Sequence, residues 1–165
     1  MFFLNRYDAA MKLAPLLEKY KNKEGVIMAV PRGGVPIGYY LAKYLNFPLD
    51  LLMSKKIGHP NNEEFAIGAG GLEGSIVENT YHIPQSYIEH EINIIRKSLA
   101  ERYKKFMGNK APLDIKDKIV IVVDDGIATG KTILVTLKLL RAGNPKKLVV
   151  AVPVSSVEAA KSIAK

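Results

Sequence analysis

The sequence is best interpreted from one stretch, IVIVVDDGIATGKT at residues 119–132. Its first five residues are apolar and β-branched, which predicts a strand buried on both faces of a parallel sheet. Asp124 and Asp125 follow at the carboxyl end of that strand, where ligands bind in parallel sheets. Small and polar residues then lead into an apolar-periodic segment at 131–141, which predicts a loop and a helix. The stretch therefore predicts a strand-loop-helix unit whose loop faces a ligand.

The predicted loop suits a phosphate group. A helix N-terminus offers unpaired N–H groups and the positive end of a dipole, and Gly130 lets the backbone approach a ligand closely. Two carboxylates would repel a bare phosphate, so Asp124 and Asp125 fit better as acceptors for sugar hydroxyls or as neighbours of a divalent metal. Taken alone, an acid pair at a strand end is an ordinary turn. Gly-Lys-Thr at 130–132 does not make a nucleotide P-loop, because that motif requires glycine where this chain has Asp125.

The segments on either side of this stretch alternate between helical and strand patterns. We expect helices at 6–20, 35–45, 131–141 and 155–165, and strands at 26–30, 49–53, 119–123 and 148–152. Pro15 is expected to kink or split the first helix, and Ser155 or Ser156 to cap the last. Strands separated by helices predict an α/β fold, a doubly wound and mainly parallel sheet with helices on both faces.

The middle of the chain departs from this pattern. Residues 54–82 are rich in Gly, Asn, Pro and Glu. Segments 65–69 and 75–78 predict a hairpin across Gly70-Gly71 or nearby, or the stretch forms a mobile lid. A long amphipathic helix is predicted at 84–107. We therefore expect one domain over residues 1–165 with a small hairpin or lid insertion at 57–82. The last predicted helix reaches Lys165 without a stop signal, which leaves open whether the native chain continues.

Composition narrows the compartment and the partners. The chain has no cysteine, which excludes disulfides and thiolate catalysis. No apolar run approaches the roughly 20 residues of a membrane span, and the first residues do not resemble a signal peptide, so we expect a cytoplasmic protein without a membrane partner. The formal charge of +8 fits a lysine-rich surface or an anionic partner. Because the basic residues are scattered and no RNA-binding signature is present, nucleic acid is not the favoured partner.

Residues 122–132 resemble the motif by which type I phosphoribosyltransferases bind 5-phosphoribosyl-1-pyrophosphate (PRPP): an apolar strand, two acids and a short Thr/Gly loop. The resemblance implies that Asp124 and Asp125 bind the ribose 2- and 3-hydroxyls and are the catalytic residues. It also implies which residues hold the 5-phosphate: Ala128, Thr129, Gly130, Lys131 and Thr132. The string NEEFAIGA at 62–69 resembles a bacterial and archaeal subgroup of unassigned substrate.

The resemblance extends to the first predicted strand. Pro31-Arg32-Gly33-Gly34 follows that strand where the family has its pyrophosphate loop, so Arg32, Gly33 and Gly34 are expected to bind pyrophosphate through backbone N–H groups and a guanidinium. Lys55 and Lys56 follow the next strand, and several family members have a basic pyrophosphate contact there. Solvated surface lysines fit these two positions almost equally well. Residues 57–82 occupy the region of the family's flexible catalytic loop.

The resemblance implies an enzyme that uses PRPP and transfers its phosphoribosyl group to a nitrogen nucleophile, a nucleobase, releasing pyrophosphate. Mg²⁺ is the implied cofactor, held mainly through PRPP rather than by a direct protein site, and a homodimer is the implied assembly. Ala128 stands where enzymes for hypoxanthine and guanine carry a further Asp, which argues against a 6-oxopurine acceptor that depends on that acid. The alternative is a non-catalytic sensor of PRPP or nucleotides that binds RNA or DNA.

Overall fold

The computed structural model describes residues 2–78, 80 and 82–164, and the chain divides into two compact units. Unit 1 consists of Met1–Leu52, Pro112–Gly130 and Gly143–Lys165, and unit 2 consists of Met53–Ala111 and Lys131–Ala142. Each unit is built on a sheet of its own, parallel in unit 1 and antiparallel in unit 2.

The sheet of unit 1 has four parallel strands in the order β2-β1-β6-β7. Its strands are β1 (Gly25–Ala29), β2 (Leu49–Leu51), β6 (Ile119–Val123) and β7 (Lys147–Ala151). Every residue of the two central strands β1 and β6 is buried, as their continuous apolar runs predict. The predicted α/β fold with a parallel sheet is therefore confirmed.

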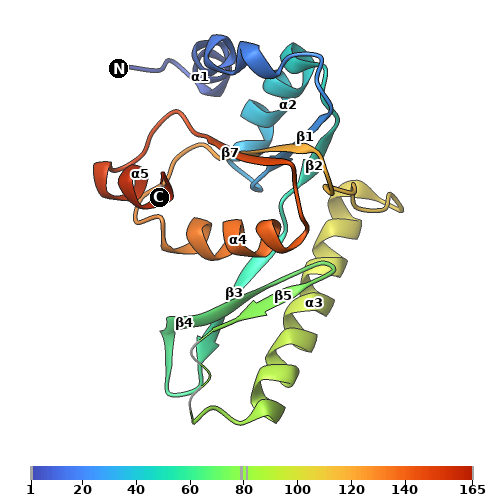
Figure 1. The fold of residues 1–165 in the computed structure, drawn as a ribbon, viewed down its shortest axis with the longest axis vertical. Helices are drawn as coiled ribbons and strands as arrows, with labels where there is room; N and C mark the ends of the chain where they lie inside the picture. Colours follow the sequence, from blue (N-terminus) through green and yellow to red (C-terminus); the bar gives the residue numbers. More distant parts are fainter. Residues whose placement is uncertain (1, 79, 81, 165) are drawn as a thin grey trace. The chain divides into compact units, whose positions relative to one another are not determined.

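Four helices belong to unit 1 among the residues that the structure describes. They are α1 (Arg6–Leu13), the 3₁₀-helix η1 (Ala14–Tyr20), α2 (Gly34–Leu45) and α5 (Val157–Ile163). Figure 1 shows α1 and α2 together on one side of the sheet. Ile37, Leu41 and Leu45 recur every four residues along α2 and are fully buried in the core beneath it. The predicted interruption at Pro15 is confirmed, because α1 gives way to η1 one residue before it.

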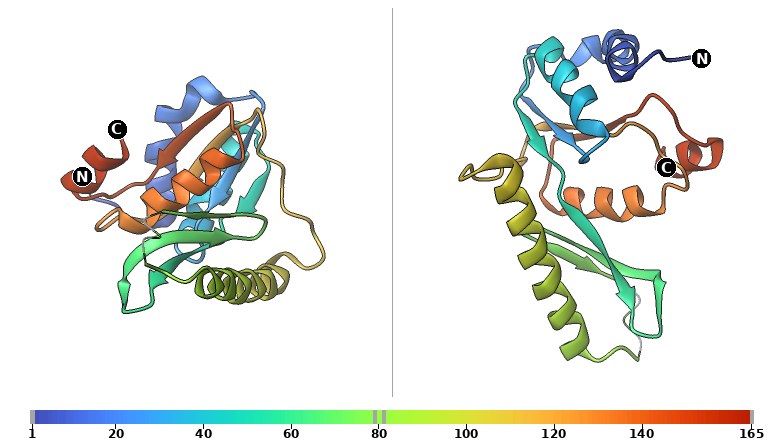
Figure 2. Two further views of the ribbon diagram at one scale, coloured as in Figure 1. Left: turned by 60° about the horizontal axis from the view of Figure 1, so that its bottom comes forward. Right: turned by 180° about the vertical axis from the view of Figure 1, so that it is seen from behind.

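Unit 2 is an antiparallel sheet between two helices. Its elements are β3 (Ser54–His59), β4 (Asn62–Gly71), β5 (Ser75–Val77), α3 (Gln85–Met107) and α4 (Lys131–Ala142). Gly70 of β4 faces Ile95 of α3, whereas Gly71 faces Leu139 of α4. Because successive strand residues point to opposite faces, α3 and α4 cover opposite faces of the sheet, as the left view of Figure 2 shows.

The predicted hairpin in the middle of the chain is confirmed, because β4 pairs antiparallel with β5. Its connection lies just after Gly70-Gly71, and both glycines lie inside β4. Packing explains them, since a Cβ on Gly70 would lie 2.9 Å from Ile95 and one on Gly71 2.8 Å from Leu139. Lys55 and Lys56 follow β2 in the chain, as predicted, and lie within β3 of the antiparallel sheet.

No helix in the part of the chain that the structure describes is long and apolar enough to cross a membrane. The expected lid at 57–82 includes Asn79 and Tyr81, which lie outside the described residues. Its closure over a ligand, and the treatment of residues 1–165 as one domain, stay predictions.

Candidate functional site

Two loops of unit 1 lie side by side at the carboxyl ends of its central strands. β1 and β6 are parallel neighbours whose last paired residues are Ala29 and Val123, so the segments after them leave the sheet at one edge. The N–H of Val30 donates to the carbonyl oxygen of Val123 at 2.8 Å, which continues the pairing beyond the strand. The predicted pyrophosphate loop and the predicted diol loop are therefore neighbours.

The contact between these loops leaves no room for a side chain. A Cβ on Gly34 would collide with the carbonyl oxygen of Val123 and lie 2.8 Å from the Cα of Asp124. A Cβ on Gly33 would collide with the carboxylate of Asp125. The peptide bond between Pro31 and Arg32, at the start of the loop, is cis. Glycine at positions 33 and 34 is thus what allows the first loop to touch both acids.

The two acids have different surroundings. Asp124 is half-buried, and its Oδ1 accepts a hydrogen bond from the backbone N–H of Asp125 at 2.8 Å. Burial raises the pKa of Asp124; that backbone hydrogen bond opposes the rise, and the charge of Asp125 adds to it. Asp125 is instead paired with a cation, since Arg6 of α1 donates to its Oδ2 from Nη2 at 2.6 Å and from Nε at 3.2 Å.

The second loop is fixed by the segment that follows β7. Ile127 is buried and forms an isolated parallel bridge with that segment. Its N–H donates to the carbonyl oxygen of Val154 at 3.0 Å, and its own carbonyl accepts from the N–H of Ser156 at 3.1 Å. Ser156 also caps α5, accepting at Oγ from the N–H of Ala159, as predicted for one of the two serines.

The tip of this loop is open to solvent. Gly130 has a φ of +75°, a conformation that glycine adopts readily, and it is buried against Ala159 of α5. Ala128 and Thr129 lie between Ile127 and Gly130 and are exposed. The loop therefore presents a short exposed turn between two fixed points, which is a suitable form for binding a small anion through backbone N–H groups.

Four predicted site residues belong to unit 2. Lys131 and Thr132 begin α4, and the role predicted for the Lys131 side chain lies outside what the structure describes. Lys55 and Lys56 lie in β3, where Lys56 forms an ion pair with Glu64 at 3.1 Å. The ligand contacts assigned to these four residues stay predictions.

Arg6 is the residue near the acids that the sequence prediction missed. It lies 119 residues before Asp125, in the first turn of a helix whose pattern predicts only packing. A parallel sheet brings such distant segments to one edge, so no local motif could have identified the pair.

The site contains carboxylate oxygens that could bind a metal ion, but they do not form a metal-binding cluster by themselves. Among the described residues, no three His, Cys, Asp or Glu side chains gather in a group that could hold an ion. Mg²⁺ typically keeps several waters and binds through one or two carboxylates together with substrate phosphates. The adjacent carboxyl groups of Asp124 and Asp125 fit an ion that arrives with a polyphosphate ligand.

Comparison with protein families defines the class. The family model for the phosphoribosyl transferase domain matches residues 5–165, so the chain belongs to that family. The predicted resemblance to type I phosphoribosyltransferases is thereby confirmed.

Individual relatives agree with this assignment. The chain is 36% identical over 157 residues to Rv0571c of Mycobacterium tuberculosis, a protein provisionally named a phosphoribosyl transferase; the match covers 92% of this chain and 35% of that protein. Among solved structures, TT1426 from Thermus thermophilus has a TM-score of 0.87 at 34% identity over 99% of this chain and 80% of its own. A purine phosphoribosyltransferase from Pyrococcus horikoshii shares the fold, with a TM-score of 0.56 at 21% identity, covering 96% of this chain and 77% of its own.

Proposed function

We propose that this protein transfers a 5-phosphoribosyl group from PRPP to a nitrogen nucleophile, a nucleobase, with release of pyrophosphate. The observation that carries the proposal is the direct contact of the Gly33-Gly34 loop with Asp124 and Asp125 at one edge of the parallel sheet. Membership of the phosphoribosyl transferase domain family supports the same reaction.

The residues at this edge match the three polar parts of PRPP. The N–H of Gly33 and the Arg32 guanidinium suit pyrophosphate, whereas the N–H groups of Gly34 and Val35 already donate to the carbonyl oxygens of Val30 and Arg32. The carboxylates of Asp124 and Asp125 suit the ribose diol, because ionised carboxylates accept hydrogen bonds from hydroxyls. The turn at 128–130, in which Ala128 and Thr129 are exposed, suits the 5-phosphate, with its backbone N–H groups and the Thr129 hydroxyl as donors.

The reaction requires a nitrogen lone pair to attack the anomeric carbon while the carbon–oxygen bond to pyrophosphate breaks and its electron pair leaves with pyrophosphate. Positive charge develops on the ribose ring during this exchange, and the carboxylates of Asp124 and Asp125 stabilise it electrostatically. Fixing the ribose at its hydroxyls and its 5-phosphate also removes much of the entropy cost of the attack. Mg²⁺, bound with PRPP, supplies the charge that neutralises the departing pyrophosphate.

The proposal extends to the acceptor and the assembly. Ala128 carries no acid that could handle a base proton, which favours an acceptor that does not depend on one at that position. A homodimer in the cytoplasm is part of the proposal, to be tested by light scattering and cell fractionation.

Calorimetric titration with PRPP and Mg²⁺, followed by a pyrophosphate-release assay over a panel of nucleobases, tests the function. The wild-type protein is expected to bind PRPP and to release pyrophosphate with at least one base. Replacing both acids, Asp124→Asn with Asp125→Asn, is expected to weaken PRPP binding about 100-fold, since two hydrogen bonds to charged acceptors become weaker, neutral ones. Circular dichroism of the double variant should match the wild type.

Glu18→Gln is the matched control, because it removes an exposed acid that is paired with Lys21 in unit 1, outside the predicted lid. Its PRPP affinity should stay within about two-fold of the wild type, as expected for a weak surface ion pair. Binding of PRPP without pyrophosphate release from any base would favour the sensor alternative. A folded wild-type protein that binds no PRPP would contradict the proposal.

A further inference from the structure

We propose that Arg6 is a positioning residue for the ribose-binding site: it holds the carboxylate of Asp125 so that one oxygen stays available to a sugar hydroxyl. This inference rests on the proposed function, because it assigns Arg6 a role in binding the ribose of PRPP.

Both hydrogen bonds of Arg6 go to one oxygen of the carboxylate. Nη2 and Nε of Arg6 both donate to Oδ2 of Asp125, at 2.6 and 3.2 Å. Among the described residues, none donates a hydrogen bond to Oδ1 of Asp125. A carboxylate has about four acceptor sites, so Oδ1 retains the capacity to receive a ribose hydroxyl. Gly33 packs against the same carboxylate, which adds a second constraint on its orientation.

Charge gives the pair a second purpose. Asp124 and Asp125 are adjacent acids, and the proposed ligand carries phosphate and pyrophosphate groups that they repel. The guanidinium of Arg6 is permanently charged and offsets one of the two negative charges without contacting the other. Arg6 therefore lets the loop keep two acids for the diol while reducing their repulsion of an anionic ligand.

The pair contributes little to stability, which points to a role in binding. The side chains of Arg6 and Asp125 are 55% and 38% exposed, and exposed ion pairs stabilise proteins only weakly. Removing Arg6 is therefore expected to change ligand affinity much more than the melting temperature.

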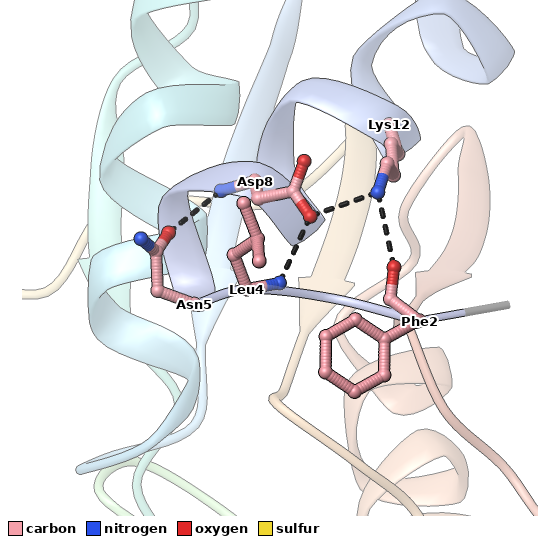
Figure 3. Close-up of polar contacts among 5 residues, drawn as sticks. All are labelled: Phe2, Leu4, Asn5, Asp8 and Lys12. Carbon is pink, nitrogen blue, oxygen red and sulfur yellow. Dashed lines mark hydrogen bonds and ion pairs between the residues drawn. The ribbon is translucent and has the colours of Figure 1, made fainter.

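Arg6 is held in place by an N-terminal clasp, drawn in Figure 3 and consisting of Phe2, Leu4, Asn5, Asp8 and Lys12. Oδ1 of Asn5 accepts from the N–H of Asp8 at 2.9 Å and caps α1, whose first residue is Arg6. Oδ2 of Asp8 accepts from the N–H of Leu4 at 3.1 Å and from Nζ of Lys12 at 2.8 Å. Lys12 also donates to the carbonyl oxygen of Phe2 at 3.0 Å. The clasp fixes the segment before Arg6 to the helix that follows it.

Two ligands distinguish a role in orienting the diol acceptor from a direct contact with pyrophosphate or a general effect on the site. Ribose 5-phosphate contains the diol without pyrophosphate, and inorganic pyrophosphate contains no diol. Arg6→Met is expected to bind PRPP and ribose 5-phosphate about ten-fold more weakly, as for the loss of an oriented hydrogen bond to a charged group. Its affinity for pyrophosphate should fall less, by about two- to three-fold, because pyrophosphate is affected by the lost charge but not by the orientation of the diol acceptor. Arg6→Lys, which keeps the charge but lacks the two guanidinium nitrogens that donate to Oδ2, should recover part of the loss.

Three comparisons complete the experiment. Lys21→Met removes another exposed, ion-paired cation of unit 1 and should leave all three affinities within two-fold. Arg32→Met should show the converse pattern, with pyrophosphate and PRPP weakened more than ribose 5-phosphate. In an Asp125→Asn background, Arg6→Met should cause no further loss, because Arg6 acts through that carboxylate.

Several results would overturn the inference. Unchanged or tighter ribose 5-phosphate binding by Arg6→Met would show that Arg6 does not orient the diol acceptor, and tighter binding would mean that it blocks it. Equal losses for pyrophosphate and ribose 5-phosphate would show a general effect or a direct contact with pyrophosphate. A wild-type protein that binds neither PRPP nor ribose 5-phosphate would instead contradict the proposed function, and this inference with it.

Discussion

The two sheets of this protein organise the chain in opposite ways. In unit 1, parallel pairing of β1 with β6 brings residues 30–34 and 124–130 to one edge, although about a hundred residues separate them. In unit 2, antiparallel pairing joins near neighbours, such as Ser54 with Gly71 across one short connection. The parallel sheet can therefore assemble a binding site from distant loops, whereas the antiparallel sheet gives a helix-covered framework.

The neighbours of one glycine in each unit also differ. Gly34 of unit 1 approaches backbone atoms of Val123 and Asp124, which cannot move without disturbing the sheet edge. Gly71 of unit 2 approaches the end of the Leu139 side chain, which can change rotamer. Equal substitutions at these two glycines should have unequal effects.

The largest expected effect is that of Gly34→Ala. Its new Cβ would collide with fixed backbone, so the free energy of unfolding should fall by about 1–3 kcal/mol, the usual cost of overpacking. PRPP affinity should fall at least about ten-fold, since a shift of the loop costs a charge-assisted contact. Denaturant unfolding and calorimetric titration measure the two quantities. Gly71→Ala is the control, expected to lose less than about 1 kcal/mol; equal losses would remove the contrast between backbone and side-chain neighbours.

Parts of this architecture were predictable because their signals are local. The buried run at 119–123 and the acids after it predict a strand and a binding loop, and the structure has that strand at those residues. β4 was not predictable as one strand, because its first four residues are exposed and its glycines have no side chains to show a pattern. The pairing of Arg6 with Asp125 was not predictable either, since only the folded sheet brings them together.

A medium effect is expected at a partly buried hydroxyl pair of unit 2. Oγ of Ser54 lies 2.8 Å from Oγ1 of Thr136. Because Thr136 donates its one hydroxyl hydrogen to the carbonyl oxygen of Thr132 at 2.9 Å, it accepts from Ser54. Thr136→Val keeps the shape but leaves the Ser54 hydroxyl without this partner, so stability should fall by about 1 kcal/mol. Ser54→Ala in the Thr136→Val background should cause little further loss. Fully additive losses in a double-mutant cycle would show that the two hydroxyls do not interact.

The smallest effect on stability is expected from Asp124→Asn. It is compared with Asp8→Asn, which changes an acid near the amino terminus of the same unit. Burial raises the pKa of Asp124 above its ordinary value of 3.8, so between that value and the raised one the folded protein binds more protons than the unfolded chain. Stability therefore falls as pH rises through this window, and at neutral pH the ionised carboxylate works against folding. Asparagine keeps the Oδ1 acceptor for the N–H of Asp125 and removes the charge, so the variant should melt slightly higher at pH 7, with the difference shrinking as pH falls towards 4.

Asp8→Asn is expected to change the melting temperature at pH 7 in the opposite direction. The hydrogen bond from Lys12, with one from the N–H of Leu4, lowers the pKa of Asp8 below 3.8, so its contribution to stability is complete above that value and is lost as pH falls through the lowered pKa. Asp8→Asn should therefore melt slightly lower than the wild type at pH 7, with the difference disappearing in acid. Melting curves for both variants from pH 3 to pH 7 measure the contrast. If both variants melted lower than the wild type at pH 7, the folded protein would stabilise the ionised form of Asp124 as it does that of Asp8. The ionised carboxylate of the binding loop would then not reduce the stability of the protein.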